Sequence, residues 1–277
     1  MTLESQNLIN AQGESLTVEQ AIANLRQTED SGLRYYAAWW LGRFRITQPE
    51  AIEALVVALE DDIDRAPDGG YPLRRNAARA LGKLGQRRVV PALIACLDCP
   101  DYYVRESATQ ALETLGDTRA IAPLLALLSG GVEAATQVPG KPHLVQPYNA
   151  ILEALGSLGA IAAVTKIAPF LEHDWPQVQN AATRAMYQLT GDEHYGDRLV
   201  QRLQAPNLQL RRSAMMDLGA IGYLPAAQPI ATTLAENSLK LIALQGILES
   251  HLQHIGFPAS GLSTEAEQVL SLMDDLL

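Results

Sequence analysis

The chain has 277 residues, of which 48% are hydrophobic and 19% charged, with glycine and proline at ordinary frequencies. This composition excludes disordered, collagen-like and low-complexity proteins. The 31 acidic and 21 basic residues give a formal net charge of −10, which disfavours general binding to nucleic-acid phosphates. The sequence contains no apolar run long enough to span a membrane, and residues 1–15 lack the basic start and apolar core of a signal peptide. We therefore expect a cytosolic globular protein.

One pattern recurs along the chain: apolar-Arg-x-x-Ala-Ala-x-Ala-Leu-Gly-x-Leu-Gly. Its best copies occupy residues 73–85, 104–116 and 210–222, and the basic unit has about 31 residues. Two insertions, 61–71 and 129–146, are rich in glycine, proline or acidic residues and are predicted to be loops. The copies begin at Leu33, Leu73, Val104, Pro147, Val178, Leu210 and, weakly, Leu239.

An apolar segment precedes each copy and is predicted to be a helix that pairs with the helix of the copy. These first helices are expected at 18–26, 50–60, 91–97, 121–128, 162–171, 197–203 and 225–234. No run of alternating β-branched residues suggests a sheet. A pair of short amphipathic helices buries its apolar stripe only by stacking on other pairs. The pattern thus resembles HEAT-like repeats and predicts an all-α fold: a right-handed α-solenoid of about seven pairs, forming one domain over 1–277, with a capping helix over 264–277.

Two positions of the pattern point away from the apolar stripe, because successive helical residues are 100° apart. The third position reads Tyr35, Arg75, Glu106, Asn149, Asn180 and Arg212, and the seventh reads Trp39, Arg79, Gln110, Glu153, Arg184 and Met216. This mixture of rings, guanidinium groups and carboxylates suits a flat, partly apolar, dianionic ligand, although a protein-binding groove is the alternative. The tenth position is mostly glycine, which we expect to let a flat ligand approach the backbone.

Residues 65–88 carry seven basic side chains and a single acidic one, Asp68. This segment suits an anion or an acidic partner surface. The alternative is that the arginines of the repeat, such as Arg34, Arg74 and Arg105, only tie neighbouring turns to aspartate.

Cysteine and histidine spacings give weaker signals. Cys96 and Cys99 form a Cys-x-x-Cys pair without further zinc ligands, so core and turn roles are favoured. His251 and His254 lie three residues apart without a third ligand, and structural roles are favoured for them too. The segment 173–175, His-Asp-Trp, lies at an expected turn that can touch a partner.

The segment 33–42 has four aromatic residues within six positions where the repeat usually has alanine. Together with the repeats behind it, this segment resembles the E subunits of E/F-type phycobilin lyases over essentially the whole chain. The resemblance implies a heterodimer with an F-type subunit that attaches phycocyanobilin, as substrate rather than tightly bound cofactor, to a cysteine of the apo-phycocyanin α subunit by a thioether. It also implies a phycobilisome-associated role in the cyanobacterial cytosol. A related heterodimer also isomerises the bilin, an activity associated with a His-Cys motif on its partner subunit. This sequence has no His-Cys pair, so we do not expect it to isomerise the bilin.

For that substrate we assign roles by helical phase. The propionates are assigned to Arg75 and Arg79, with Arg184 in reserve, and a carboxylate, Glu106 or Glu153, to the pyrrole N–H groups and the proton transfer. The other expected bilin contacts are Tyr35, Tyr36, Trp39, Trp40 and Asn149, although the phase of Trp40 points to the buried side.

Two alternatives stay open. A HEAT-like adaptor or chaperone would bind phycobiliproteins without chemistry and would not need the aromatic segment. A HEAT-like DNA-repair enzyme would need a basic groove along the whole chain, which the net charge of −10 disfavours.

Overall fold

The computed structural model describes residues 16–255 and 262–277, without the side chains of 254 and 255. Residues 1–15, examined above for a signal peptide, and the side chain of His254 therefore lie outside the described residues. The described chain is helical, with short 3-10 turns and one isolated β-bridge between Gln137 and Leu144. No helix within 16–255 or 262–277 is long and apolar enough to cross a membrane.

The chain forms two compact units. The N-terminal unit comprises residues up to Leu127 together with Gln137–Pro147, and the C-terminal unit comprises Leu128–Thr136 and Tyr148–Leu277. The predicted helix pairs are confirmed in both, so the fold is an α-solenoid of HEAT-like pairs.

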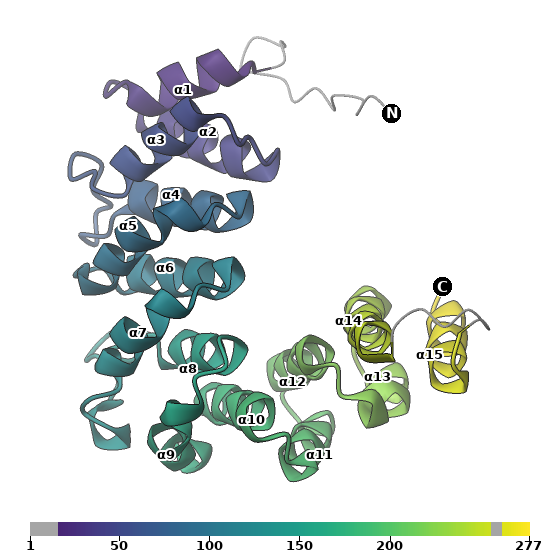
Figure 1. Cartoon of the computed structure of the whole chain (residues 1–277). Coiled ribbons are helices and arrows are strands. Elements are labelled where there is room, and N and C mark those ends of the chain that lie inside the picture. The colour runs from purple at the N-terminus through teal and green to yellow at the C-terminus, as the bar shows by residue number, and fades with distance from the viewer. Residues whose placement is uncertain (1–15, 256–261) are drawn as a thin grey trace. The chain divides into compact units, whose positions relative to one another are not determined.

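In the N-terminal unit the second helices of successive pairs pack side by side, α2 on α4 and α4 on α6 (Figure 1). The insertion 61–71 joins α3 to α4, and residues 137–147 come from the second insertion. The helices of this unit are α1 (Val18–Arg26), α2 (Ser31–Arg43), α3 (Pro49–Ala58), α4 (Pro72–Leu84), α5 (Val90–Ala95), α6 (Tyr102–Leu115) and α7 (Ile121–Leu127).

In the C-terminal unit α8 packs on α10, α10 on α12 and α12 on α14, and the last helix, α15, packs against α13 and α14 (Figure 1). The helices are α8 (Tyr148–Ser157), α9 (Val164–Ile167), α10 (Pro176–Thr190), α11 (Glu193–Arg202), α12 (Leu208–Ile221), α13 (Ala227–Thr232), α14 (Asn237–Ile255) and α15 (Thr264–Asp274).

Two first helices differ most from the prediction. The segment 162–171 is not one helix: α9 gives way to a 3-10 turn over Ala168–Glu172, where Pro169 has no N–H to donate to an α-helical bond. Helix α11 starts four residues before the predicted 197, because the Asp192 carboxylate accepts a hydrogen bond from the His194 N–H and caps the helix.

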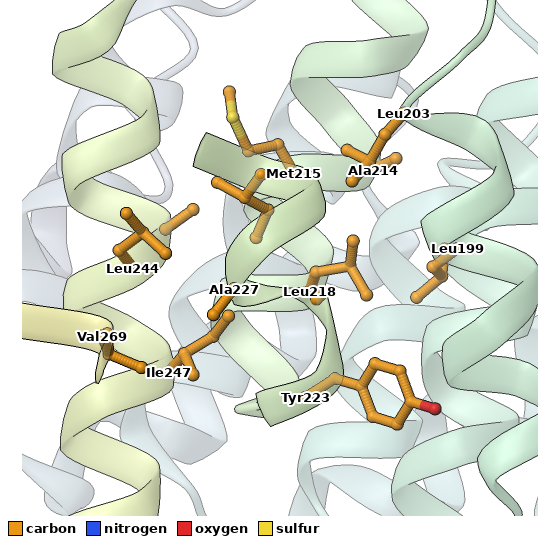
Figure 2. Close-up of a cluster of buried hydrophobic side chains, with 13 residues drawn as sticks. Leu199, Leu203, Ala214, Met215, Leu218, Tyr223, Ala227, Leu244, Ile247 and Val269 are labelled. Carbon is orange, nitrogen blue, oxygen red and sulfur yellow. The ribbon is translucent and has the colours of Figure 1, made fainter. Parts of the chain in front are cut away.

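The core of the C-terminal unit shows how the pairs hold together. Figure 2 shows its side chains meeting between helices α11, α12, α14 and α15, and each is almost fully buried. Burying one such leucine or isoleucine contributes about 1.5 to 3 kcal/mol, so each pair depends on its neighbours. The cluster includes Leu199, Leu203, Met215, Leu218, Leu244, Ile247 and Val269.

The tenth-position glycines are buried where neighbouring second helices meet, so their role in the fold is helix packing. A Cβ on Gly42 would lie 2.7 Å from the Ala80 Cα, and a Cβ on Gly82 would lie 2.9 Å from the Ala111 Cα. Gly156 faces Ala185 in the same way, within the C-terminal unit. Each glycine leaves room for the backbone of the next second helix.

Replacing Gly42 by alanine is predicted to lower the free energy of unfolding by about 1 to 3 kcal/mol, because overpacking costs that much. The opposing gain in helix propensity is about 0.5 to 1 kcal/mol, so the clash decides the sign. Urea unfolding followed by circular dichroism measures it, with Arg43→Ala on the exposed side of the same helix as control. A stability equal to or above that of the wild type would show that α2 and α4 are not in close contact at Gly42.

Candidate functional site

Helix α2 presents an aromatic surface. The rings of Tyr36 and Trp39 stack with their centroids 5.6 Å apart, and Trp39 is 42% exposed. Tyr35, on the same helix, is partly buried. Trp40 is 8% exposed and packs on Phe44 with ring centroids 5.0 Å apart. Trp40 is thus a core residue, as its helical phase indicates, and leaves the predicted set of ligand contacts. The aromatic surface thus consists of the exposed Trp39 and the partly buried Tyr35 and Tyr36.

The predicted charged residues of the N-terminal unit come together on the facing helices α4 and α6. Burial raises the pKa of the Glu106 carboxyl above its usual range, while Arg79, a hydrogen bond from the Tyr102 hydroxyl, Arg75 and His143 act in the opposite direction. A partly buried carboxylate therefore lies in a cationic surrounding. Because the pKa of Glu106 is raised overall, the effect of burial on this pKa is larger than that of the nearby positive charges.

The two arginines of this cluster differ in their partners. The Arg75 Nη2 lies 3.5 Å from an Asp101 carboxylate oxygen, and its guanidinium group lies 4.6 Å from the centre of the Tyr103 ring. Arg79 is exposed and has no carboxylate within ion-pair distance among the described residues. Arg79 therefore makes no ion pair there, although it is the strongest positive charge acting on the Glu106 carboxyl, and its exposed guanidinium group can still meet a ligand.

One neighbour of Glu106 was not singled out from the sequence. His143, from the second insertion, stacks on Tyr102 with ring centroids 4.2 Å apart, and its Nδ1 donates to the Leu144 carbonyl at 2.8 Å. Only the packing of the insertion against the start of α6 brings it there, a contact for which the sequence offers no signal. The same packing lines a pocket of about 630 Å³ with Arg65, Tyr71, Tyr102, Tyr103, Lys141 and His143.

The remaining predicted site residues belong to the C-terminal unit. The Arg184 Nη1 lies 3.6 Å from a carboxylate oxygen of Glu153 and 3.6 Å from one of Asp217. Asn149 is partly buried on α8. Because Arg184 and Glu153 already neutralise each other, neither is as well suited to a ligand's charge as Arg79 or Glu106.

The second-position arginines of the repeat have structural roles, but only Arg34 binds aspartate carboxylates as the alternative interpretation predicts, whereas Arg74 and Arg105 bind main-chain carbonyls. Arg34 is 6% exposed and donates to Asp61 at 2.8 Å and to Asp64 at 2.6 Å. Arg74 donates to the carbonyls of Glu60 and Asp61. These contacts fix the insertion 61–71 against α2 and α4.

Arg105 repeats this role with the second insertion. It donates to the Cys99 carbonyl at 2.6 Å and to the Val145 carbonyl at 2.8 Å. These arginines thus hold the two insertions in place. Fewer cations of the chain are therefore available to bind a ligand.

The cysteine and histidine candidates are held in structural contacts. Cys96 and Cys99 are buried, and burial raises the pKa of the Cys96 thiol to about 12. The buried His173 accepts from the Trp175 N–H through Nδ1 and therefore donates to the Ala135 carbonyl through Nε2, both at 2.9 Å. His251 hydrogen-bonds the Ser263 hydroxyl at 2.8 Å. No group of three metal-ligating side chains occurs within the described ranges.

Replacing Arg34 by methionine should lower the free energy of unfolding by about 3 to 5 kcal/mol, because it leaves two nearly buried carboxylates without their partner. Arg119→Met, at an exposed ion pair with Asp117, is the matched control and should leave the stability unchanged. Urea unfolding of both variants measures the difference. Equal effects would contradict the role given to Arg34.

Comparisons with known proteins bear on the whole chain. The family described as PBS lyase HEAT-like repeat matches residues 33–61, and the family described as HEAT repeats matches residues 63–137. The phycocyanobilin lyase subunit alpha of Synechocystis sp. (strain PCC 6803) is 65% identical over 94% of this chain and 96% of its own length.

Two further proteins are similar over nearly all of the chain. The bilin biosynthesis protein PecE of Nostoc sp. (strain PCC 7120) is 44% identical over 95% of this chain and 96% of its own. The solved complex of CpcE and CpcF of phycocyanin lyase from Nostoc sp. PCC7120 contains a chain that matches with a TM-score of 0.89 and 56% identity over 100% of both chains.

Proposed function

The chain belongs to the family of phycocyanobilin lyase alpha subunits, and from this premise we propose that it binds phycocyanobilin and attaches it to a cysteine of the phycocyanin α subunit. The bond formed is a thioether, and the chain acts together with an F-type partner subunit. We place this reaction in the cyanobacterial cytosol, where it supplies the phycobilisome. The bilin is the substrate.

The observation that carries the proposal is one face of the N-terminal unit, on the packed helices α2, α4 and α6. It combines the exposed ring of Trp39, the exposed cation Arg79 and the partly buried carboxyl of Glu106. Phycocyanobilin is a linear tetrapyrrole with two propionates, so it needs both stacking and cationic contacts. Aromatic stacking contributes about 0.5 to 1.5 kcal/mol beyond area burial, and a charge-assisted hydrogen bond about 1.5 to 3 kcal/mol. A few such contacts suffice for micromolar binding.

The reaction adds the acceptor thiol across the exocyclic ethylidene of ring A. A carbon–sulfur bond forms, the carbon–carbon π bond breaks, and the tetrapyrrole takes up a proton. An ordinary thiol with a pKa of about 8.5 is already a few per cent thiolate at pH 7, so the nucleophile needs little activation. Holding the flexible bilin in one conformation supplies the positioning part of the rate and selects the reacting carbon.

Glu106 is the better candidate of the two predicted carboxylates for giving the proton. Burial raises its pKa, which keeps a larger fraction protonated than in an exposed glutamate. Glu153 lies 3.6 Å from the Arg184 guanidinium, and a neighbouring cation favours its ionised form.

Co-expression with apo-phycocyanin α, the F-type partner and bilin biosynthesis tests the function, with covalent bilin read on a denaturing gel under zinc. Omitting this chain should abolish the colour. Trp39→Ala with Tyr36→Ala should lower attachment at least about tenfold, since two stacking partners are lost, while Val57→Ala at an exposed site on α3 is the control. Helix content should stay unchanged in all variants.

Full attachment without this chain would contradict the lyase function. If the chain proved dispensable for attachment but still bound phycobiliproteins, the adaptor alternative would replace it. Full attachment by the double aromatic variant would remove α2 from the bilin contacts.

The pH profile of single-turnover attachment tests Glu106. The relevant pH range runs from the pKa of Glu106, which is raised above the ordinary 4.5, up to the thiol pKa of about 8.5. Within this range each rise in pH increases the thiolate fraction and decreases the protonated fraction of Glu106 by the same factor. The wild-type rate should therefore be nearly flat over this range. In Glu106→Gln only the thiol titrates, so a rate about 100-fold lower should rise about tenfold per pH unit.

Glu153→Gln is the matched control and should keep the flat profile. A rising wild-type profile, or a flat one in Glu106→Gln, would show that Glu106 does not donate the proton.

A further inference from the structure

A second pocket, of about 280 Å³, lies between α4 and α6 on the same face of the N-terminal unit. Its lining includes Arg79, Gly82, Lys83, Ser107, Gln110 and Thr114. Its floor is the contact at which a Cβ on Gly82 would lie 2.9 Å from the Ala111 Cα. The volume is below the usual range for a whole drug-sized ligand, so the pocket suits a side arm rather than a ring system.

The hydroxyl of Ser107 has no hydrogen-bond partner among the described residues, although the residue is 0% exposed. Buried polar groups in native proteins are nearly always satisfied, and leaving one unsatisfied costs free energy. Ser107 lines the pocket although its hydroxyl oxygen has no exposed surface, so the side chain has to rotate toward the pocket before a ligand's acceptor oxygen supplies the missing partner. This orphaned donor distinguishes the pocket from an ordinary surface groove.

Positive charge surrounds the pocket. Arg79 and Lys83 are both exposed, and neither lies within ion-pair distance of a carboxylate in the part of the chain that the structure describes. Arg45 adds a third cation nearby, because its Nη1 donates to the Lys83 carbonyl at 3.4 Å. Two cations and a hydroxyl donor around a small volume favour a carboxylate.

The aromatic surface lies on α2, the helix that packs against α4 of the pocket. Trp39 on α2 and Arg79 on α4 occupy the same position of the repeat, and the two helices pack against each other. A planar ligand stacked on Trp39 thus has this pocket within reach of a short flexible arm. Arg75 and Arg184, by contrast, already face carboxylates.

We propose that the pocket between α4 and α6 binds one propionate carboxylate of the bilin. Arg79 and Lys83 supply the charge and Ser107 donates a hydrogen bond. This rests on the proposed function and identifies Lys83 and Ser107 as substrate-binding residues. The other propionate lies outside this pocket.

Equilibrium binding of phycocyanobilin and of its dimethyl ester to the complex with the F-type partner tests the proposal. Arg79→Gln and Lys83→Met should each raise the Kd for the free acid about tenfold, which corresponds to about 1.4 kcal/mol. Ser107→Ala should raise it about threefold. The ester should bind weakly to the wild type and equally to all variants, because it carries no charge at this position.

Arg88→Gln, an exposed cation of the same unit outside the pocket, is the matched control, and circular dichroism verifies folding. Unchanged affinity for the acid in all three pocket variants, or an equal loss for the ester, would overturn the assignment. The assignment would also be overturned if the pocket variants no longer assembled with the partner but kept their affinity for the bilin. The pocket would then bind a carboxylate of the partner subunit. A wild-type complex that binds neither compound would instead contradict the proposed function itself.

Discussion

The close contact of neighbouring second helices is the constraint on which the rest of the structure depends. Glycine on one helix meets alanine on the next, as at Gly42 with Ala80 and Gly82 with Ala111. Such contact fixes how far apart the helices lie and which turns face each other. Equivalent positions of successive repeats then fall next to each other, so that residues about 31 positions apart in sequence act on one surface. The binding face of the N-terminal unit follows from this contact.

The distribution of charge decides which residues on that face can meet a ligand. Most arginines of the repeat are used internally: Arg34 and Arg74 hold the insertion 61–71, and Arg75 faces Asp101. Arg79 and Lys83 are the cations that the fold leaves facing a small pocket. The net charge of −10 therefore does not exclude the anion site that we propose at this pocket. Binding of a bilin at this site also requires an aromatic surface nearby, and helix α2 provides one.

Much of the fold follows from the sequence, because the helices repeat one apolar period and each pair must stack to bury it. Where the observed helix bounds differ from the predicted ones, single residues are the cause, such as Pro169, which lacks an N–H, and Asp192, whose carboxylate caps α11. The spacing of apolar residues does not report on these effects. Helical phase placed Trp39 outside and Trp40 inside correctly. It could not foresee that the tenth-position glycines face another helix, nor that an insertion brings His143 to Glu106, because both depend on packing between distant segments.

The central claim is that the bilin lies on helices α2, α4 and α6 of the N-terminal unit. A structure of the complex of this chain and its partner with phycocyanobilin bound tests it most directly. We expect a pyrrole ring against the Trp39 indole, pyrrole N–H groups near the Glu106 carboxyl, and one propionate between Arg79 and Lys83. A tetrapyrrole bound instead at Glu153 and Arg184, with the pocket between α4 and α6 filled by protein side chains, would contradict it.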